Sequence, residues 1–103
     1  MKIIGTGSSL PSLSVTNEML SVFLDTSDEW IRSRTGILER RIISDENLKD
    51  LAIEASQKAL DDAGLTGSEL DYIICSNVVN YYVTPSISCL VAGGIQAACP
   101  CVD

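Results

Sequence analysis

The sequence contains no histidine, and this absence removes several kinds of catalysis from the chain. Without an imidazole, a serine or cysteine lacks the usual base that activates it as a nucleophile, and histidine acid–base catalysis is excluded. An enzyme of either kind would need residues from outside these 103 positions.

Cysteine pairs of the kind that bind zinc are also missing. The four cysteines are Cys75, Cys89, Cys99 and Cys101, and no two of them form a CxxC pair. Common zinc sites need such pairs or histidine ligands, so we expect no metal site. In a reducing compartment, cysteines are usually free and packed as small apolar side chains. We therefore expect mostly buried thiols.

Basic residues and long apolar runs are scarce. The chain has 7 lysines and arginines against 14 acidic residues, and its formal net charge is −7. This acidity disfavours nucleic acid as a partner, because phosphate backbones attract basic proteins. No apolar run is long enough to cross a bilayer, and Gly5 interrupts the apolar start where a signal peptide would continue. We expect a cytoplasmic protein with neither a nucleic-acid nor a membrane partner.

The residues that are present predict an α/β fold. A hydrophobic content of 46% is normal for a globular protein. Apolar spacing and turn residues place helices between strands, which indicates a central sheet covered by helices. The expected strands are 2–5, 39–43, 71–76 and the start of 99–103, and the expected helices are 16–24, 27–35, 48–63 and 84–95.

The helix expected at 48–63 has the clearest pattern. Its apolar residues recur at three- and four-residue spacings, and Gly64 is suited to end it. The segment 71–76 is typical of a strand buried on both faces, and Thr84 and Pro85 suit the first positions of a helix. Because the sequence stops within an expected strand, we expect an incomplete domain.

The glycines after the first strand do not complete a dinucleotide-binding motif. Gly5 and Gly7 begin such a pattern, but Leu10 stands where the third glycine is needed, and Pro11 follows it. We expect a tight structural turn at these glycines.

The stretch DTSDEWIRSRTGI at residues 25–37 contains the only tryptophan of the chain. Thr26 and Glu29 match a capping box, and Gly36 suits a helix C-terminus, so the stretch predicts a two-turn helix at 27–35. Acidic residues at its start and arginines in its last turn favour this helix through its dipole.

Trp30 and Arg34 are four positions apart and therefore share one face of this helix. The pair is either a tryptophan docked on the core with an arginine over its edge, or a platform for a planar group whose phosphates the arginines hold. A cluster of four arginines suits an anion site as well as a solvated face of paired charges; its members are Arg32, Arg34, Arg40 and Arg41.

Several phrases of the sequence together resemble the β-ketoacyl-acyl-carrier-protein synthase III family of the thiolase superfamily. They follow the family's order and approximate spacing over nearly the whole chain, and DTSDEWIRSRTGI is the strongest. The others are IIGTGSSLP at 3–11, ER at 39–40, EAS..AL..AG at 54–64, TPS at 84–86 and CPCVD at 99–103. The resemblance implies that residues 1–103 are the N-terminal portion of a thiolase-like domain, truncated before the catalytic cysteine.

The resemblance implies a condensing enzyme that starts fatty acid synthesis. In this family a cysteine takes an acyl group, usually acetyl, from coenzyme A, and malonyl-acyl carrier protein then decarboxylates and attacks the thioester. The implied partners are acyl-coenzyme A, an acyl carrier protein and a second copy in a homodimer. Coenzyme A thioester is a substrate, and no separate cofactor is implied.

The resemblance also implies roles for individual residues. Trp30 would stack on the adenine of coenzyme A, Thr26 would lie beside that adenine, and Arg34 would line the same entrance. Thr84 would approach the acyl pocket of the partner subunit.

No catalytic residue is expected within the chain. The family's nucleophilic cysteine lies shortly beyond the aspartate that matches Asp103, and its histidine and asparagine come later still. Cys99 and Cys101 precede that nucleophile, and the helix before Cys99 looks one residue shorter than the family's, which affects the register near the dimer contact. Two alternatives stay open: a non-catalytic module that binds coenzyme A or a partner, and a sister family with another starter or acceptor.

Overall fold

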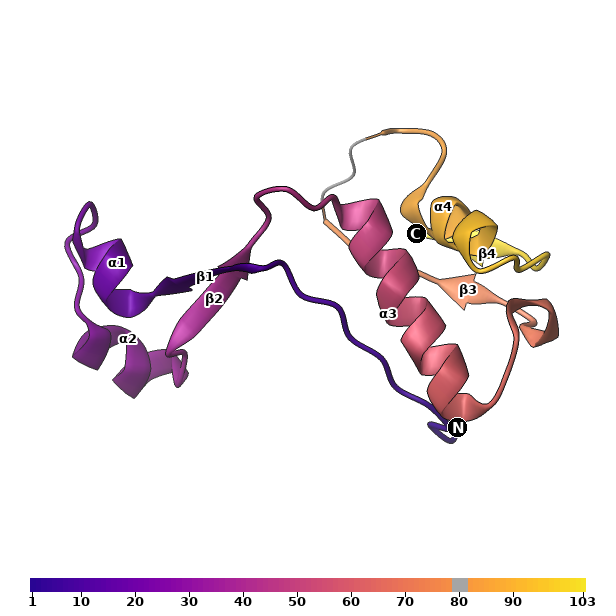
Figure 1. Cartoon of the computed structure of the whole chain (residues 1–103), viewed down its shortest axis with the longest axis horizontal. Helices are drawn as coiled ribbons and strands as arrows, with labels where there is room; N and C mark the ends of the chain where they lie inside the picture. The colour runs from indigo at the N-terminus through magenta and orange to yellow at the C-terminus, as the bar shows by residue number, and fades with distance from the viewer. Residues whose placement is uncertain (79–81) are drawn as a thin grey trace. The chain divides into compact units, whose positions relative to one another are not determined.

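The computed structural model describes residues 1–78 and 82–103, which form two compact units. One unit is Leu10–Glu46, and the other combines Met1–Ser9 with Asn47–Asp103. Both contain helices and strands, as Figure 1 shows, and the expected α/β class is confirmed. Within the described residues, no helix is long and apolar enough to cross a membrane.

The unit Leu10–Glu46 is built on one antiparallel pair of strands. Its elements are β1 (Leu13–Thr16), α1 (Asn17–Ser21), α2 (Asp28–Thr35) and β2 (Glu39–Ile42). β1 pairs with β2 over four residues, from Leu13 opposite Ile42 to Thr16 opposite Glu39. The strand predicted at 39–43 is confirmed, whereas apolar spacing does not predict β1.

Helix α1 is shorter than the predicted 16–24. Thr16 caps it, and its hydroxyl accepts from the Met19 N–H at 3.3 Å. The helix ends at Ser21, and the chain then turns, with the Phe23 N–H donating to the Leu20 carbonyl at 3.2 Å. Phe23 is 71% exposed, so no packing stabilises a further helical turn.

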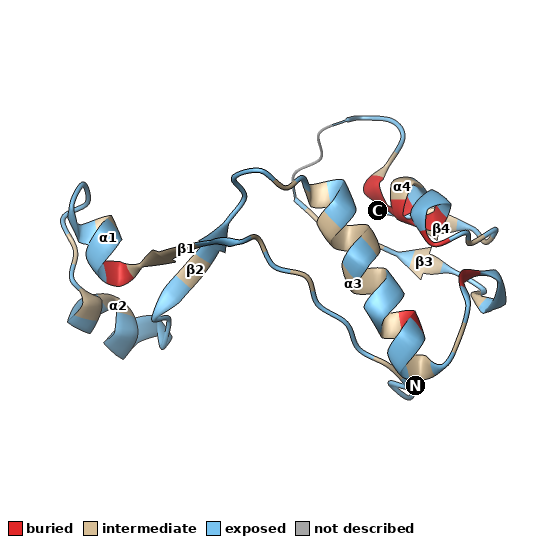
Figure 2. Ribbon diagram, in the orientation of Figure 1, coloured by how far each residue is buried: buried red, intermediate tan, exposed pale blue. Residues whose placement is uncertain are grey.

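The other unit centres on two packed helices. Its elements are α3 (Leu48–Ala63), the 3₁₀ turn η1 (Gly67–Glu69), β3 (Ile73–Ile74), α4 (Ile87–Gly94) and β4 (Cys101–Val102). β3 and β4 run parallel. Leu60 of α3 and Val91 and Ile95 at α4 form the buried core, which contributes to the red parts of these helices in Figure 2.

Helix α3 has the predicted bounds. Asn47 caps its N-terminus, and its side chain accepts from the Asp50 N–H at 2.9 Å. Gly64 ends the helix at a φ of 69°, in the left-handed region that glycine adopts readily.

Residues 2–5 do not form the predicted strand. A strand needs a neighbouring backbone, and this segment instead lies against α3, where the Thr6 N–H donates to the Asp62 carboxylate at 2.9 Å. Gly7 permits this approach, because a Cβ at that position would clash with the backbone of Ala55.

The strand predicted at 71–76 forms only at Ile73–Ile74 and is not buried on both faces. Ile73 packs against the core, whereas Ile74 is 78% exposed. Burial of a second face needs another layer, and among the described residues none covers Ile74.

Helix α4 begins at Ile87, after the start that Thr84 and Pro85 predict. Ser86 is its N-cap. The carboxylate of Asp103, just after β4, accepts hydrogen bonds from the first two N–H groups of the helix at 2.9 and 2.8 Å. These bonds from a distant residue fix where the helix starts, which local sequence does not reveal.

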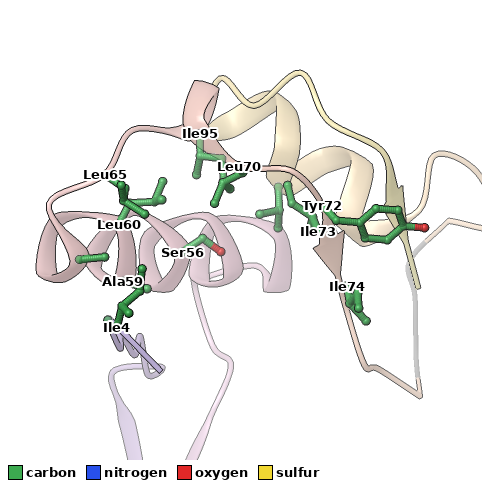
Figure 3. A pocket seen from close by; sticks show the side chains of 13 residues that line it. Ile4, Ser56, Ala59, Leu60, Leu65, Leu70, Tyr72, Ile73, Ile74 and Ile95 are labelled. Carbon is green, nitrogen blue, oxygen red and sulfur yellow. The ribbon is translucent and has the colours of Figure 1, made fainter. Parts of the chain in front are cut away.

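An apolar pocket opens between α3, α4 and β3, as Figure 3 shows. Isoleucine, leucine and alanine side chains line most of it, and Ser56 and Tyr72 bring its only side-chain hydroxyls among the described residues. Among the described residues that line it, none carries a charge, and the Tyr72 phenol is the one group that can ionise.

Glu46 joins the two ends of the unit Leu10–Glu46. Its carboxylate accepts from the backbone N–H groups of Ser12 at 2.6 Å and Ser44 at 3.2 Å. Hydrogen bonding, with Ser12 the largest cause, lowers the pKa of Glu46 from 4.5 to about 2. Since the folded-state pKa is the lower one, the ionised carboxylate stabilises this unit above pH 4.5, and its contribution is lost as the pH falls toward 2.

Glu46→Gln is expected to reduce this acid dependence, because an amide oxygen still accepts a hydrogen bond but carries no titrating charge. Urea unfolding followed by Trp30 fluorescence, between pH 4.5 and about pH 2, measures the effect. Asp45→Asn removes a neighbouring exposed carboxylate and serves as the control, which should keep the wild-type pH profile. Identical profiles for Glu46→Gln and wild type would contradict this role.

Candidate functional site

Helix α2 carries the tryptophan, and its N-cap is Ser27. The backbone of Ser27 is extended, and its hydroxyl accepts from the Trp30 N–H at 3.2 Å. The capping box predicted for Thr26 and Glu29 is therefore wrong by one residue, because adjacent hydroxyl residues offer the same chemistry and the backbone angles select one of them. Gly36 ends the helix at a φ of 71°, as predicted.

Trp30 and Arg34 lie on one face of α2, as their spacing predicts. The guanidinium carbon of Arg34 is 4.8 Å from the centre of the Trp30 ring, which is a cation–π distance. Trp30 is 55% exposed, so it is not part of the buried core. The pair presents an aromatic surface and a cation to solvent.

An open hollow lies beside this pair. The residues that line it come from the turn before α2 and from its first turn: Leu24, Asp25, Thr26, Ser27 and Trp30. The hydroxyl oxygen of Thr26 is buried and has no hydrogen-bond partner among the described residues. The structure therefore brings Thr26 and Trp30 to one hollow, and Arg34 adjoins it through Trp30.

The other arginines of the cluster have structural contacts of their own. Arg40 donates to the Val15 carbonyl at 3.1 Å, across the β1–β2 pair. Arg41 and Arg32 form exposed ion pairs at 3.6 and 3.8 Å, which contribute little to stability. The four arginines do not form one anion site, and Arg34 is the arginine placed on the tryptophan.

Asn17 fixes both ends of α2. It is 0% exposed, and its amide donates to the Asp28 carboxylate and to the Ile37 carbonyl, both at 2.8 Å. Its oxygen accepts from the Arg40 guanidinium at 2.5 Å. Nothing in the local sequence shows that partners from three other segments converge on Asn17. This network sets the position of Trp30.

Thr84 is exposed in the segment before α4. It belongs to the unit formed by Met1–Ser9 and Asn47–Asp103, whereas Trp30 belongs to the other unit. Thr26, Trp30 and Arg34 thus lie together in one unit, and Thr84 lies in the other.

The cysteines are less buried than predicted. Cys89 is exposed, and Cys75, Cys99 and Cys101 are half-buried. They lie in or beside the two-stranded pair of β3 and β4 and in the first turn of α4, where a single layer gives partial cover.

The chain matches known proteins over most of its length, although no family model matches it. β-Ketoacyl-[acyl-carrier-protein] synthase III of Clostridium perfringens is 57% identical over 96 residues, covering 93% of this chain and 30% of that protein. The structure of 3-oxoacyl-[acyl-carrier-protein] synthase III from Aquifex aeolicus VF5 has a TM-score of 0.91 and 44% identity, covering 99% of this chain and 33% of that one. The priming β-ketosynthase of the R1128 polyketide pathway has a TM-score of 0.86 and 34% identity, covering 96% and 30%.

The sequence comparison and the structure comparison thus both find synthase III enzymes. The chain spans about 30% of the length of the curated relative described above. By sequence and by its thiolase-like fold, the chain belongs to the β-ketoacyl-acyl-carrier-protein synthase III family.

Proposed function

We propose that this chain is the N-terminal portion of a β-ketoacyl-acyl-carrier-protein synthase III, the condensing enzyme that starts fatty acid synthesis. The name and 57% identity of the Clostridium perfringens relative support this proposal. Coenzyme A thioester is the substrate and no separate cofactor takes part. Acyl carrier protein and a second copy of the enzyme are the protein partners, and the cytoplasm is the location.

The reaction joins two acyl groups. The acetyl group of acetyl-coenzyme A passes to an enzyme cysteine, and coenzyme A leaves as its thiol. Malonyl-acyl carrier protein then loses carbon dioxide, its carbanion attacks the acetyl thioester carbon, and the cysteine thiolate leaves. No residue of this chain is assigned to these bond-making steps.

Within this activity, the chain binds the adenine end of coenzyme A. The observation that carries this proposal is the exposed Trp30 ring with Arg34 at 4.8 Å from its centre. A base stacked on an exposed aromatic ring contributes about 1–3 kcal/mol. Arg34 adds positive charge that suits the phosphates of the same nucleotide, and Thr26 lines the adjoining hollow.

Thr84 has a separate proposed role, at the flank of the acyl pocket of the partner subunit. Its exposure in the segment before α4 supports this role, because a contact with a second subunit needs a side chain at the surface.

Fluorescence titration tests the adenine site directly, because Trp30 is the only tryptophan of the chain. Coenzyme A and adenosine 3′,5′-bisphosphate are both expected to change the Trp30 emission in a saturable way, since both carry the adenine nucleotide. Pantetheine lacks the nucleotide and is the matched control, expected to leave the emission unchanged. A response to pantetheine alone, or none to coenzyme A, would contradict the assignment.

A sister activity is a second candidate, since the R1128 priming β-ketosynthase shares 34% identity and a TM-score of 0.86. Assay of the full-length protein with malonyl-acyl carrier protein and a series of acyl-coenzyme A starters separates the candidates. A preference for acetyl-coenzyme A supports fatty acid initiation, and a preference for another starter supports the sister activity. A non-catalytic module would bind coenzyme A at Trp30 and form no β-ketoacyl product.

A further inference from the structure

Cys89 and Cys101 meet at the N-terminal end of α4 although they are 12 positions apart in the sequence. Their sulfur atoms are 3.1 Å apart, and neither is in a disulfide. Cys89 is exposed and Cys101 is half-buried, so a small oxidant can reach the pair from solvent.

Asp103 holds the two segments that carry these cysteines together. Cys101 and Asp103 are two positions apart at β4, so their side chains project from the same side of the strand. The Asp103 carboxylate accepts from the N–H groups of Ile87 at 2.9 Å and Ser88 at 2.8 Å, directly before Cys89. The hydrogen bonds of Asp103 therefore hold the backbone near Cys89 next to the backbone near Cys101.

The two thiols differ in acidity. A hydrogen bond from Ser86, and a second from Cys101, lower the pKa of Cys89. The hydrogen bond with Cys89, followed by burial, raises the pKa of Cys101. The position of Cys89 in the first turn of α4 favours its thiolate further. Although burial and the Asp103 charge oppose it, the net lowering of its pKa leaves Cys89 the more acidic thiol of the pair and Cys101 the less acidic one.

We propose that Cys89 and Cys101 form a site of reversible oxidation, which hydrogen peroxide converts to an intramolecular disulfide. The Cys89 thiolate attacks one peroxide oxygen, the O–O bond breaks, and hydroxide leaves, which gives a sulfenic acid at Cys89. The Cys101 sulfur then attacks the Cys89 sulfur, the S–O bond breaks, and water leaves with the Cys101 proton. The hydroxide takes up the proton that Cys89 lost on ionising, so in total two thiols are oxidised to one disulfide and one peroxide is reduced to two waters.

The disulfide joins the first turn of α4 to β4 by a covalent bond. The same two elements are already tied by Asp103, so the bond forms without separating them. A dithiol compound restores the two thiols by exchange.

Peptide mapping of the full-length protein after treatment with equimolar hydrogen peroxide tests this site. No lysine or arginine follows Lys58, so trypsin leaves all four cysteines of the chain in one peptide. Chymotrypsin, which cleaves after Leu90, separates Cys89 from Cys99 and Cys101. After alkylation of free thiols, we expect a peptide with Cys89 joined to one with Cys101, and we expect dithiothreitol to release them.

Serine variants assign the bond to its two sulfurs. Cys89→Ser and Cys101→Ser should lose it, whereas Cys75→Ser and Cys99→Ser should keep it, with circular dichroism reporting the fold of each. Tandem mass spectrometry of the wild-type linked peptides distinguishes Cys99 from Cys101 without any variant. A link from Cys89 to another cysteine, or no Cys89–Cys101 link in the folded wild type, overturns the proposal. Neither result bears on coenzyme A binding.

Discussion

Replacing Trp30 with alanine in the full-length protein is expected to raise KM for acetyl-coenzyme A by about fivefold or more and to leave kcat nearly unchanged. Removing a stacking contact of about 1–3 kcal/mol weakens binding by roughly 5- to 150-fold. The adenine is far from the reacting thioester, so the ground state and the transition state lose the same contact, which affects KM and spares kcat. Initial rates against acetyl-coenzyme A, at saturating malonyl-acyl carrier protein, measure both constants.

Two variants separate this loss of binding from a loss of structure. Trp30→Phe keeps an aromatic ring and should recover much of the affinity. Phe23→Ala removes another exposed ring of the same unit, one that does not line the hollow at Thr26, and should leave KM unchanged. Because Trp30 is 55% exposed, its replacement should also leave Tm nearly unchanged. A lowered Tm with an unchanged KM would mean that Trp30 serves packing.

Asn17→Leu is expected to lower the free energy of unfolding of the unit Leu10–Glu46 by about 3 kcal/mol. Leucine has a similar shape but removes the partner of the Ile37 carbonyl and one partner each of Asp28 and Arg40. Polar groups left without partners in a buried site are costly, and charged ones more so. Urea unfolding followed by Trp30 fluorescence measures the loss, because Trp30 lies in the same unit.

Ser21→Ala is the matched control for Asn17→Leu. Ser21 lies in the same helix, is exposed, and donates one hydrogen bond, to the Glu18 carbonyl at 2.6 Å. Its replacement should change the free energy of unfolding by no more than about 0.5 kcal/mol. If both variants lose the same small amount, the buried network at Asn17 is not what holds α2.

Local signals in the sequence predict the helices better than the strands. The apolar spacing of α3 and the glycine after it are contained in a short stretch, and both bounds agree with the structure. Residues 2–5 and 71–76 have the composition of strands, but pairing depends on a neighbouring backbone that local sequence does not specify. The prediction that the cysteines are mostly buried failed for a similar reason. Burial depends on the layers that cover an element, and local sequence does not specify those layers.

The site was predictable as far as one helix face determines it. Four-residue spacing places Arg34 beside Trp30, and the structure confirms that contact at 4.8 Å. The choice of Ser27 over Thr26 as N-cap depends on backbone angles that both residues can adopt. The role of Asn17 depends on Arg40, which is 23 positions away, and no short pattern encodes such a pair.

The hydrogen bonds that Asp103 accepts from α4 also affect when this helix can be completed during synthesis. Asp103 is 16 positions after Ile87, whose N–H it accepts. A ribosome therefore completes the whole sequence of α4 before it adds the residue that satisfies the helix's first N–H groups. During synthesis the first turn of α4 lacks the Asp103 carboxylate until residue 103 has been added. A translational pause between Ile87 and Asp103 would prolong the interval in which that turn can fray.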